Sequence, residues 1–118
     1  MARILIVDDS KTSRKILRGI LEEEGHEVVG EAVNGKDGIE QFQELHPDIT
    51  TMDITMPVMD GLEALKLIME YDNSAKIIMV TAAGQKTKMV DAIKYGAAEF
   101  LAKPFEAAQI ITILKKVL

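Results

Sequence analysis

The amino-acid sequence predicts an α/β fold, in which five parallel strands form one sheet and five helices cover both of its faces. Three observations favour this class. Apolar runs of strand length alternate with stretches of helical period along the whole chain. Right-handed crossovers between parallel strands place the connecting helices on both faces of the sheet. Four of the apolar runs end in a polar residue, as expected where parallel strands deliver functional groups to one edge.

The first strand and the first helix are expected at the start of the chain. Ile4–Val7 is a continuous apolar run of strand length, and Ser10 is available to cap the helix that follows. Gly25 is placed to end that helix in a left-handed conformation. Glu27–Ala32 is expected to form a strand with a polar end, at the edge of the sheet. The apolar face of the first helix is expected to hold Ile16, Leu17, Ile20 and Leu21.

The middle of the chain alternates in the same way. Asn34 caps the second helix, and His46-Pro47 ends it because proline disfavours helical geometry in the residue before it. Ile49–Met52 is expected to form the third strand, and Asp60 is expected to cap the third helix. The apolar faces of these two helices are expected to hold Ile39, Phe42, Leu45, Leu62, Leu65, Ile68 and Met69.

Two more strands and two more helices complete the pattern. Ile77–Val80 and Phe100–Ala102 are the fourth and fifth strands, and the helix between them is expected to end near Gly96. The last helix continues to the end of the chain. The apolar faces of these two helices are expected to hold Met89, Val90, Ile93, Ile110, Ile113, Leu114 and Val117.

Composition limits the location and the partners of the protein. The chain carries a net charge of −5, which argues against nucleic acid as a main partner because phosphate backbones select basic surfaces. No apolar run reaches the ~18 residues that a membrane span needs, and the N-terminus lacks the build of a signal peptide. The chain contains no cysteine, which fits a reducing compartment. We therefore expect a cytoplasmic, monomeric protein with one domain, residues 1–118, and no output domain.

The polar residues that follow the predicted strands describe a reaction centre. Asp8 and Asp9 follow the first strand, Asp53 the third, Thr81 the fourth and Lys103 the fifth. Because the carboxyl ends of parallel strands meet at one edge, these groups are expected to converge there. A single aspartate after the first strand would be explained as a helix cap. That explanation does not cover two aspartates, since Ser10 already offers a cap.

Three carboxylates at one place are costly unless a cation binds between them. Carboxylate and carbonyl oxygens suit a hard ion, and the small number of protein ligands favours Mg²⁺, which keeps several waters. We expect Asp9 and Asp53 to bind Mg²⁺ directly, with the backbone carbonyl of Thr55 as a third ligand. Asp8 is expected to act mainly through a coordinated water.

The same groups are suited to phosphoryl transfer. An ionised aspartate can act as a nucleophile and carry a covalent phosphoryl group, and Asp53 is the candidate. Lys103 and Thr81 can each bind a phosphoryl oxygen, because catalysis of this reaction consists mainly of positioning and charge neutralisation. Each also has a simpler structural explanation. Lys103 would balance the aspartates as an ion pair, and Thr81 is a β-branched residue of a strand.

The chain resembles the receiver domain of bacterial response regulators along its whole length. The segments that carry the resemblance are Ile4–Ser10, Met52–Gly61, Thr81-Ala82 and Lys103-Pro104-Phe105. In this order and spacing the four segments are highly specific. The resemblance implies a flavodoxin-like, doubly wound sheet with the strand order 2-1-3-4-5. It also implies that Asp53 receives a phosphoryl group from a phosphohistidine of a sensor histidine kinase, with Mg²⁺ required.

The resemblance implies a switch and an output as well. In this family Thr81 is coupled to an aromatic residue of the last strand, here Phe100, although a core role would also explain that residue. Movement of Thr81 would reshape the surface of the fourth helix, last strand and last helix. The residues around Asp53 are most similar to single-domain chemotaxis receivers, whose output partner is a flagellar motor switch protein. Such a protein is a signalling phosphoacceptor that assists its own phosphorylation and dephosphorylation, not an enzyme.

Three other functions share parts of this pattern. A single-domain shuttle in a phosphorelay uses the same chemistry with other partners, and Phe100, where chemotaxis receivers often carry Tyr, keeps it open. Phosphatases of the haloacid dehalogenase type need a second acidic residue two positions after the nucleophile, where this chain has Ser10 or Thr55. A flavin-binding electron carrier would offer hydroxyls and amides to a phosphate in the first loop, which here holds two aspartates.

Overall fold

The computed structural model describes residues 1–118 and contains five strands that alternate with five helices. The strands are β1 (Arg3–Val7), β2 (Glu27–Ala32), β3 (Ile49–Asp53), β4 (Ile77–Thr81) and β5 (Glu99–Ala102). The helices are α1 (Lys11–Glu23), α2 (Gly35–Leu45), α3 (Gly61–Tyr71), α4 (Lys86–Lys94) and α5 (Ala107–Val117). All paired strands are parallel and follow the order β2-β1-β3-β4-β5. The predicted fold class, strand order and edge position of β2 are confirmed.

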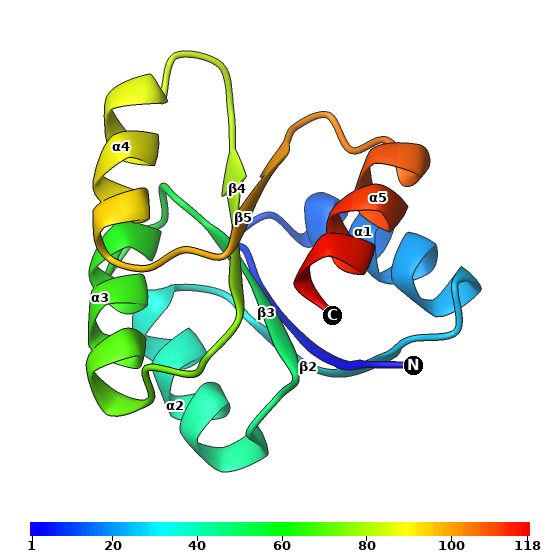
Figure 1. Ribbon diagram of the computed structural model, residues 1–118, viewed down its shortest axis with the longest axis horizontal. Coiled ribbons are helices and arrows are strands. Elements are labelled where there is room, and N and C mark those ends of the chain that lie inside the picture. The colour runs from blue at the N-terminus through cyan, green and yellow to red at the C-terminus, as the bar shows by residue number, and fades with distance from the viewer.

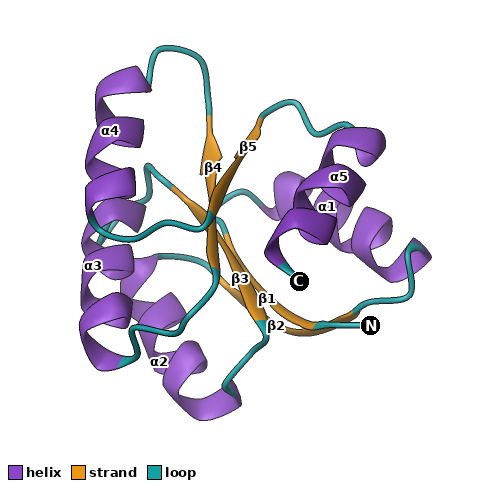
Figure 2. Ribbon diagram, viewed as in Figure 1, coloured by secondary structure: helices purple, strands orange, loops and turns teal.

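The helices form a layer on each face of the sheet (Figure 1). Helices α1 and α5 cover one face, and α2, α3 and α4 cover the other. Figure 2 shows the strands between these two layers, with the loops after β4 and β5 at the same edge of the sheet. The carboxyl ends of the parallel strands therefore share this edge, where open α/β folds place their ligands.

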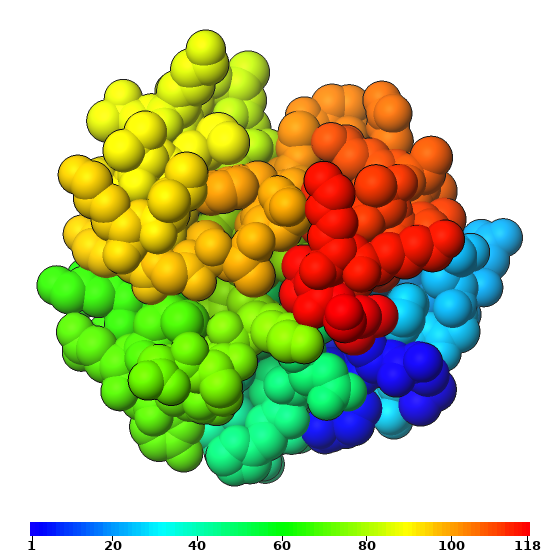
Figure 3. Space-filling model, viewed as in Figure 1, coloured from blue at the N-terminus to red at the C-terminus, as the bar shows by residue number.

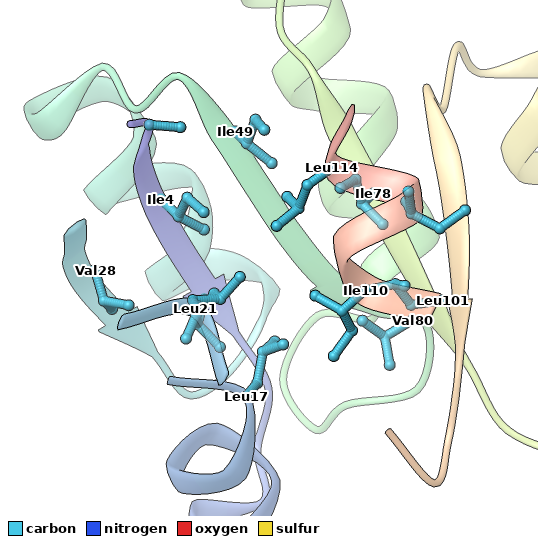
Figure 4. Close-up of a cluster of buried hydrophobic side chains, with 13 residues drawn as sticks. Ile4, Leu17, Leu21, Val28, Ile49, Ile78, Val80, Leu101, Ile110 and Leu114 are labelled. Atoms are coloured by element: carbon cyan, nitrogen blue, oxygen red, sulfur yellow. The ribbon is translucent and has the colours of Figure 1, made fainter. Parts of the chain in front are cut away.

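Each strand divides its side chains between two cores, because successive side chains of a strand point to opposite faces. In β1, Ile4 and Ile6 belong to the core beneath α1 and α5, whereas Leu5 and Val7 belong to the core beneath α2 and α3. Each core contains 13 buried hydrophobic residues, so neither face of the sheet is open to solvent. Figure 4 shows Leu17 and Leu21 of α1 and Ile110 and Leu114 of α5 packed over the first of these faces.

Side-chain caps fix where three of the helices begin. Ser10 Oγ accepts a hydrogen bond from the backbone N–H of Ser13 at 3.2 Å, and Asn34 Oδ1 accepts one from Asp37 at 2.8 Å. Asp60 Oδ1 accepts one from the N–H of Glu63 at 2.9 Å. These caps satisfy backbone donors that the helices leave free. All three predicted caps are confirmed, as is the left-handed conformation of Gly25, with φ of 84°.

Three apolar side chains lie outside the core, contrary to the sequence prediction. They are Ile16, Val90 and Ile93, with exposed fractions of 49%, 52% and 61%. Helix α1 contacts the core through the buried Leu17 and Leu21 and the partly buried Ile20, and Ile16 lies beyond the edge of this stripe. Helix α4 fully buries a single residue, the small Ala92, and half-buries Met89, whereas Val90 and Ile93 point outward.

The two ends of the chain lie at the edge of the sheet opposite to the predicted reaction centre. Met1 and Leu118 both line a hollow of about 510 Å³ at the amino ends of the strands. Figure 3 shows the two termini, in blue and red, next to each other on one face of the molecule. None of the helices has the length and apolar character that crossing a bilayer requires.

Candidate functional site

Three aspartates meet at the carboxyl edge of the sheet. Asp8 and Asp9 directly follow β1, and Asp53 is the last residue of β3, the strand that pairs with β1. One carboxylate oxygen from each aspartate lies within 4.8 Å of the other two. Asp8 and Asp53 are buried and Asp9 is exposed, so the cluster opens to solvent on one side. The sequence-predicted set of carboxylates is thus brought together by neighbouring strand ends.

Lys103 also contacts this cluster of aspartates. It follows β5, and its Nζ lies 2.9 Å from Asp8 Oδ2 and 3.4 Å from Asp53 Oδ2. Its backbone N–H donates to the carbonyl of Thr81 at 2.8 Å, which holds the residue beside the end of β4. The Lys103-Pro104 peptide bond is cis. One ammonium group therefore bridges two of the three carboxylates.

Burial and charge shift the pKa values of these groups. Burial, together with the charge of Asp8, raises the pKa of Asp53 to about 6 from an ordinary value of 3.8, and the ammonium of Lys103 offsets only part of this. Burial would lower the pKa of Lys103, but its bond to Asp8 and its attraction to Asp53 outweigh burial and raise that pKa. Lys103 therefore stays positively charged. Ionisation of Asp53 at neutral pH costs the folded protein free energy, because its pKa is raised.

This cost is expected to appear as a pH-dependent loss of stability in protein stripped of divalent ions. The folded state binds the Asp53 proton more tightly than the unfolded state, because the folded pKa is about 6 against 3.8. The stability that Asp53 contributes is therefore full below the unfolded pKa and is lost as pH rises through the folded pKa. We expect Asp53→Asn to raise the free energy of unfolding by roughly 1–2 kcal/mol at pH 7.5 and by much less at pH 4.

Urea unfolding of the parent and of Asp53→Asn in EDTA, at several pH values from 4 to 7.5, measures this difference. The control is the same series in excess Mg²⁺, where the advantage of the variant is expected to shrink because bound cation offsets the carboxylate charge. A difference between the two proteins that stays constant across the pH range in EDTA would contradict the expectation.

Arg14 braces the loop that carries the two neighbouring aspartates. Its Nη1 donates to the backbone carbonyl of Asp8 at 2.6 Å, and its Nε donates to Glu31 Oε1 at 3.0 Å. Burial would raise the pKa of Glu31, but Arg18 and Arg14 outweigh it and lower that pKa. The acidic loop is thus tied to the edge strand β2. Sequence analysis missed Arg14, although a basic residue in the first helical turns after an acidic pair is a usable signal.

Thr81 and Phe100 occupy the strands next to the cluster. Thr81 is the buried last residue of β4, and its hydroxyl donates to the carbonyl of Leu101 at 3.4 Å. The hydroxyl is therefore directed toward β5 in this structure. Phe100 is half-buried on β5 and packs against the core beneath α2 and α3. These two residues of the predicted switch lie on adjacent strands, β4 and β5.

The loop between β3 and α3 passes very close to Asp53. Val58 has a φ of 68°, rare for a β-branched residue, and the N–H of Met59 donates to the carbonyl of Pro57 at 2.7 Å around it. The N–H of Gly61 donates to the carbonyl of Ile54 at 2.7 Å. This tight return brings the start of α3 against the backbone that carries the nucleophile candidate.

Thr55 lies at the rim of the site, in the same loop. Its side chain is exposed, and its hydroxyl accepts a hydrogen bond from Gln85 Nε2 at 2.9 Å. Sequence analysis did not identify Gln85. No pattern in the sequence indicates this contact, because it depends on how two loops after different strands approach each other.

The cluster fits a divalent cation by its charge and its donors. Three carboxylates and one ammonium leave two negative charges, the number that one divalent ion neutralises. Carboxylate oxygens are hard donors of the kind that Mg²⁺ prefers. Around Asp53 there is no enclosed cavity. The two hollows of the surface, of about 210 and 510 Å³, lie near His26 on the α5 side and near Met1. A reacting group therefore approaches Asp53 from an open rim.

Comparison with known proteins agrees with this site. The family model of the response regulator receiver domain matches residues 4–115. The chemotaxis protein CheY of Thermotoga maritima is 49% identical over 115 residues, which cover 98% of this chain and 96% of that protein. CheY of Bacillus subtilis is 48% identical over 116 residues, with 98% and 97% covered.

Solved structures give the same result. The CheX–CheY–BeF3–Mg²⁺ complex from Borrelia burgdorferi contains a chain that matches with a TM-score of 0.93 and 36% identity, covering 98% of this chain and 87% of that chain. The response regulator domain of CheB from Thermotoga maritima matches with a TM-score of 0.89 and 34% identity, covering 98% of this chain and 94% of that chain. The fold, the cluster at the carboxyl edge and these matches together show that the chain belongs to the family of response regulator receiver domains.

Proposed function

We propose that Asp53 is the phosphoacceptor of this two-component receiver and takes its phosphoryl group from a phosphohistidine of a sensor histidine kinase. The observation that carries the proposal is the approach of Lys103 Nζ to Asp8 Oδ2 at 2.9 Å and to Asp53 Oδ2 at 3.4 Å. A buried carboxylate beside a fixed ammonium, at an open rim, is suited to attack a phosphoryl group that another protein presents.

The transfer step exchanges one bond to phosphorus for another. A carboxylate oxygen of Asp53 attacks the phosphorus atom and forms an O–P bond, while the N–P bond of the phosphohistidine breaks. The electron pair of that bond returns to the imidazole nitrogen. No base is required, because the carboxylate attacks in its ionised form. Lys103 stays charged and pairs with an oxygen of the transferred group, and the hydroxyl of Thr81 donates to another after leaving the carbonyl of Leu101.

Hydrolysis regenerates the acceptor. A water molecule attacks the phosphorus atom, the O–P bond to Asp53 breaks, and inorganic phosphate leaves. The chain thus assists both its own phosphorylation and its own dephosphorylation. Asp9 and Asp53, with the backbone carbonyl of Thr55, would hold Mg²⁺ directly, and Asp8 would contact it through water. When bound, the ion neutralises charge on the phosphoryl oxygens.

Incubation with a small phosphodonor tests this proposal. With Mg²⁺, intact-mass measurement is expected to show one added phosphoryl group per chain, and with EDTA in place of Mg²⁺ it is expected to show almost none. Mild alkali should remove the added mass, as for an acyl phosphate. No mass change in Mg²⁺, or equal labelling in EDTA, would overturn the proposal.

We place this receiver in chemotaxis, with a flagellar motor switch protein as the output partner. Similarity to CheY proteins supports this role, and so does the surface formed by α4, β5 and α5, which exposes the apolar side chains of Val90 and Ile93. In Figure 3, α4 in yellow and α5 in orange and red lie on the same face. Thr81 and Phe100 would couple the acyl phosphate to this surface.

Binding of a purified motor switch protein, with and without phosphodonor, tests the assignment of the partner. We expect binding to strengthen when the donor is present and Asp53 is intact. Phosphoryl transfer from the charged protein to a second histidine domain, without any effect on motor protein binding, would instead identify a phosphorelay shuttle.

A further inference from the structure

Gln85 stands at the start of α4 but does not cap it. It occupies the N-cap position, where a short polar side chain normally accepts from the first turn, and it makes no such bond. Its Oε1 instead accepts from the backbone N–H of Ala82 at 2.7 Å. Its Nε2 donates to the hydroxyl of Thr55 at 2.9 Å. Both ends of the amide are therefore used outside the helix.

The two partners of Gln85 lie on the loops that flank the phosphoacceptor candidate. Thr55 comes two residues after Asp53, and Ala82 directly follows the last residue of β4. Strands β3 and β4 are hydrogen-bonded neighbours, with Asp53 opposite Val80. The side chain of Gln85 consequently spans the rim between the ends of these two strands.

Helix α4 has few other attachments at this end. It has nine residues, its single buried residue is Ala92, and its first turn carries Lys86 and Lys88, whose charges oppose the helix dipole. Gly84, with φ of 84° and open space around it, precedes Gln85 and provides a backbone position that turns easily. Lys88 Nζ adds only a long contact of 3.5 Å to the hydroxyl of Thr55.

We propose that Gln85 is a clamp, a positioning residue that holds α4 in the unphosphorylated arrangement and opens when Asp53 carries a phosphoryl group. The inference rests on the proposed function. An acyl phosphate brings anionic oxygens to the rim, and hydrogen bonds to charged acceptors are about twice as strong as those to a neutral amide oxygen. The N–H of Ala82 therefore exchanges Gln85 for a phosphoryl oxygen, and the start of α4 is released.

The two possible roles of Gln85, a clamp and a purely structural contact, predict different experimental results. If Gln85 only stabilises the fold, its loss loosens α4 to the same degree in the phosphorylated and unphosphorylated protein. If it is a clamp, its loss matters only before phosphorylation, because afterwards the bonds are already broken. The effect of removing Gln85 on the mobility of α4, compared between the phosphorylated and unphosphorylated protein, therefore distinguishes the two roles.

Amide hydrogen exchange of residues 86–94 provides this measurement, with and without phosphodonor and Mg²⁺. Without donor, Gln85→Ala is expected to speed exchange about fivefold, the ratio that one neutral hydrogen bond typically supports. With donor, the variant and the parent are expected to exchange alike. The rate of phosphorylation by the donor is expected to rise severalfold in the variant, since no clamp has to open.

Three further variants sharpen the test. Gln43→Ala removes an exposed glutamine from α2 and is expected to behave as the parent. Thr55→Val removes the hydroxyl that Gln85 binds and is expected to speed exchange in α4, whereas Thr55→Ser keeps a hydroxyl and is expected to restore the parental rate.

Unchanged exchange in Gln85→Ala without donor would overturn the clamp, as would equal acceleration in both states or slower phosphorylation. If the parent itself gained no phosphoryl group, the proposed function would fail and the release step with it. The exchange data without donor would still show whether Gln85 tethers α4, so the two failures can be told apart.

Discussion

Replacement of Asp53 with Asn is expected to abolish phosphoryl transfer to this protein. The amide keeps the size and position of the side chain, but its oxygen is a far weaker nucleophile than a carboxylate. Intact-mass measurement after incubation with a small phosphodonor and Mg²⁺ is expected to show one phosphoryl group on the parent and none on the variant.

Two controls separate chemistry from folding in this experiment. Asp53→Asn is expected to unfold at no lower urea concentration than the parent in EDTA, because it removes a buried charge whose pKa is raised. Asp9→Asn keeps Asp53 and removes a proposed ligand of Mg²⁺, so it is expected to slow labelling without preventing it at high Mg²⁺. Labelling of Asp53→Asn at the parental rate would place the acceptor elsewhere.

Replacement of Gly61 with Ala is expected to cause the largest loss of stability. A Cβ atom at this position would lie 1.9 Å from the carbonyl oxygen of Asp53 and 3.0 Å from the Cα of Ile54. Both are backbone atoms of the segment that carries Asp53, so no side chain can rotate away to make room. We expect the free energy of unfolding to fall by roughly 2–4 kcal/mol.

Gly19→Ala is the matched control for this substitution. Gly19 is an exposed residue inside α1, and no atom lies within 4 Å of a Cβ added there. Alanine at such a position is expected to raise the free energy of unfolding by roughly 0.5–1 kcal/mol, since it favours the helix. Urea titrations of both variants measure the two effects. A Gly61→Ala variant as stable as Gly19→Ala would show that the loop after β3 adapts freely.

The sequence predicted the fold and the charged centre because both follow from regular spacing. Alternating apolar runs and helical stretches determine the order of the elements, and parallel strands bring their carboxyl ends to one edge. Asp8, Asp9 and Asp53 therefore meet, and Lys103 joins them. These residues need no detailed knowledge of the loops, since each directly follows or ends a strand.

The features that sequence analysis missed depend on the exact path of the loops or on how closely two elements pack. Gln85 meets Thr55 only because two loops approach over the rim. Ile93 lies on a helix whose one buried contact is a small alanine, so an apolar pattern at helical period did not indicate burial there. The direction of the Thr81 hydroxyl toward β5 depends on a rotamer, which spacing along the chain does not determine.

The pair of cores has a consequence for how a chemical event can be sensed at a distance. Each face of the sheet is sealed by 13 buried hydrophobic residues, and such interiors resist compression. Because such interiors transmit strain, a displacement at Asp53 is expected to be felt by side chains that pack against the same cores, Phe100 among them. The loops at the carboxyl edge can rearrange at a lower cost, because one polar contact there can be exchanged for another while both cores stay intact. In this protein, a chemical event at Asp53 is therefore expected to act first on the loops at the carboxyl edge and on the side chains in contact with them.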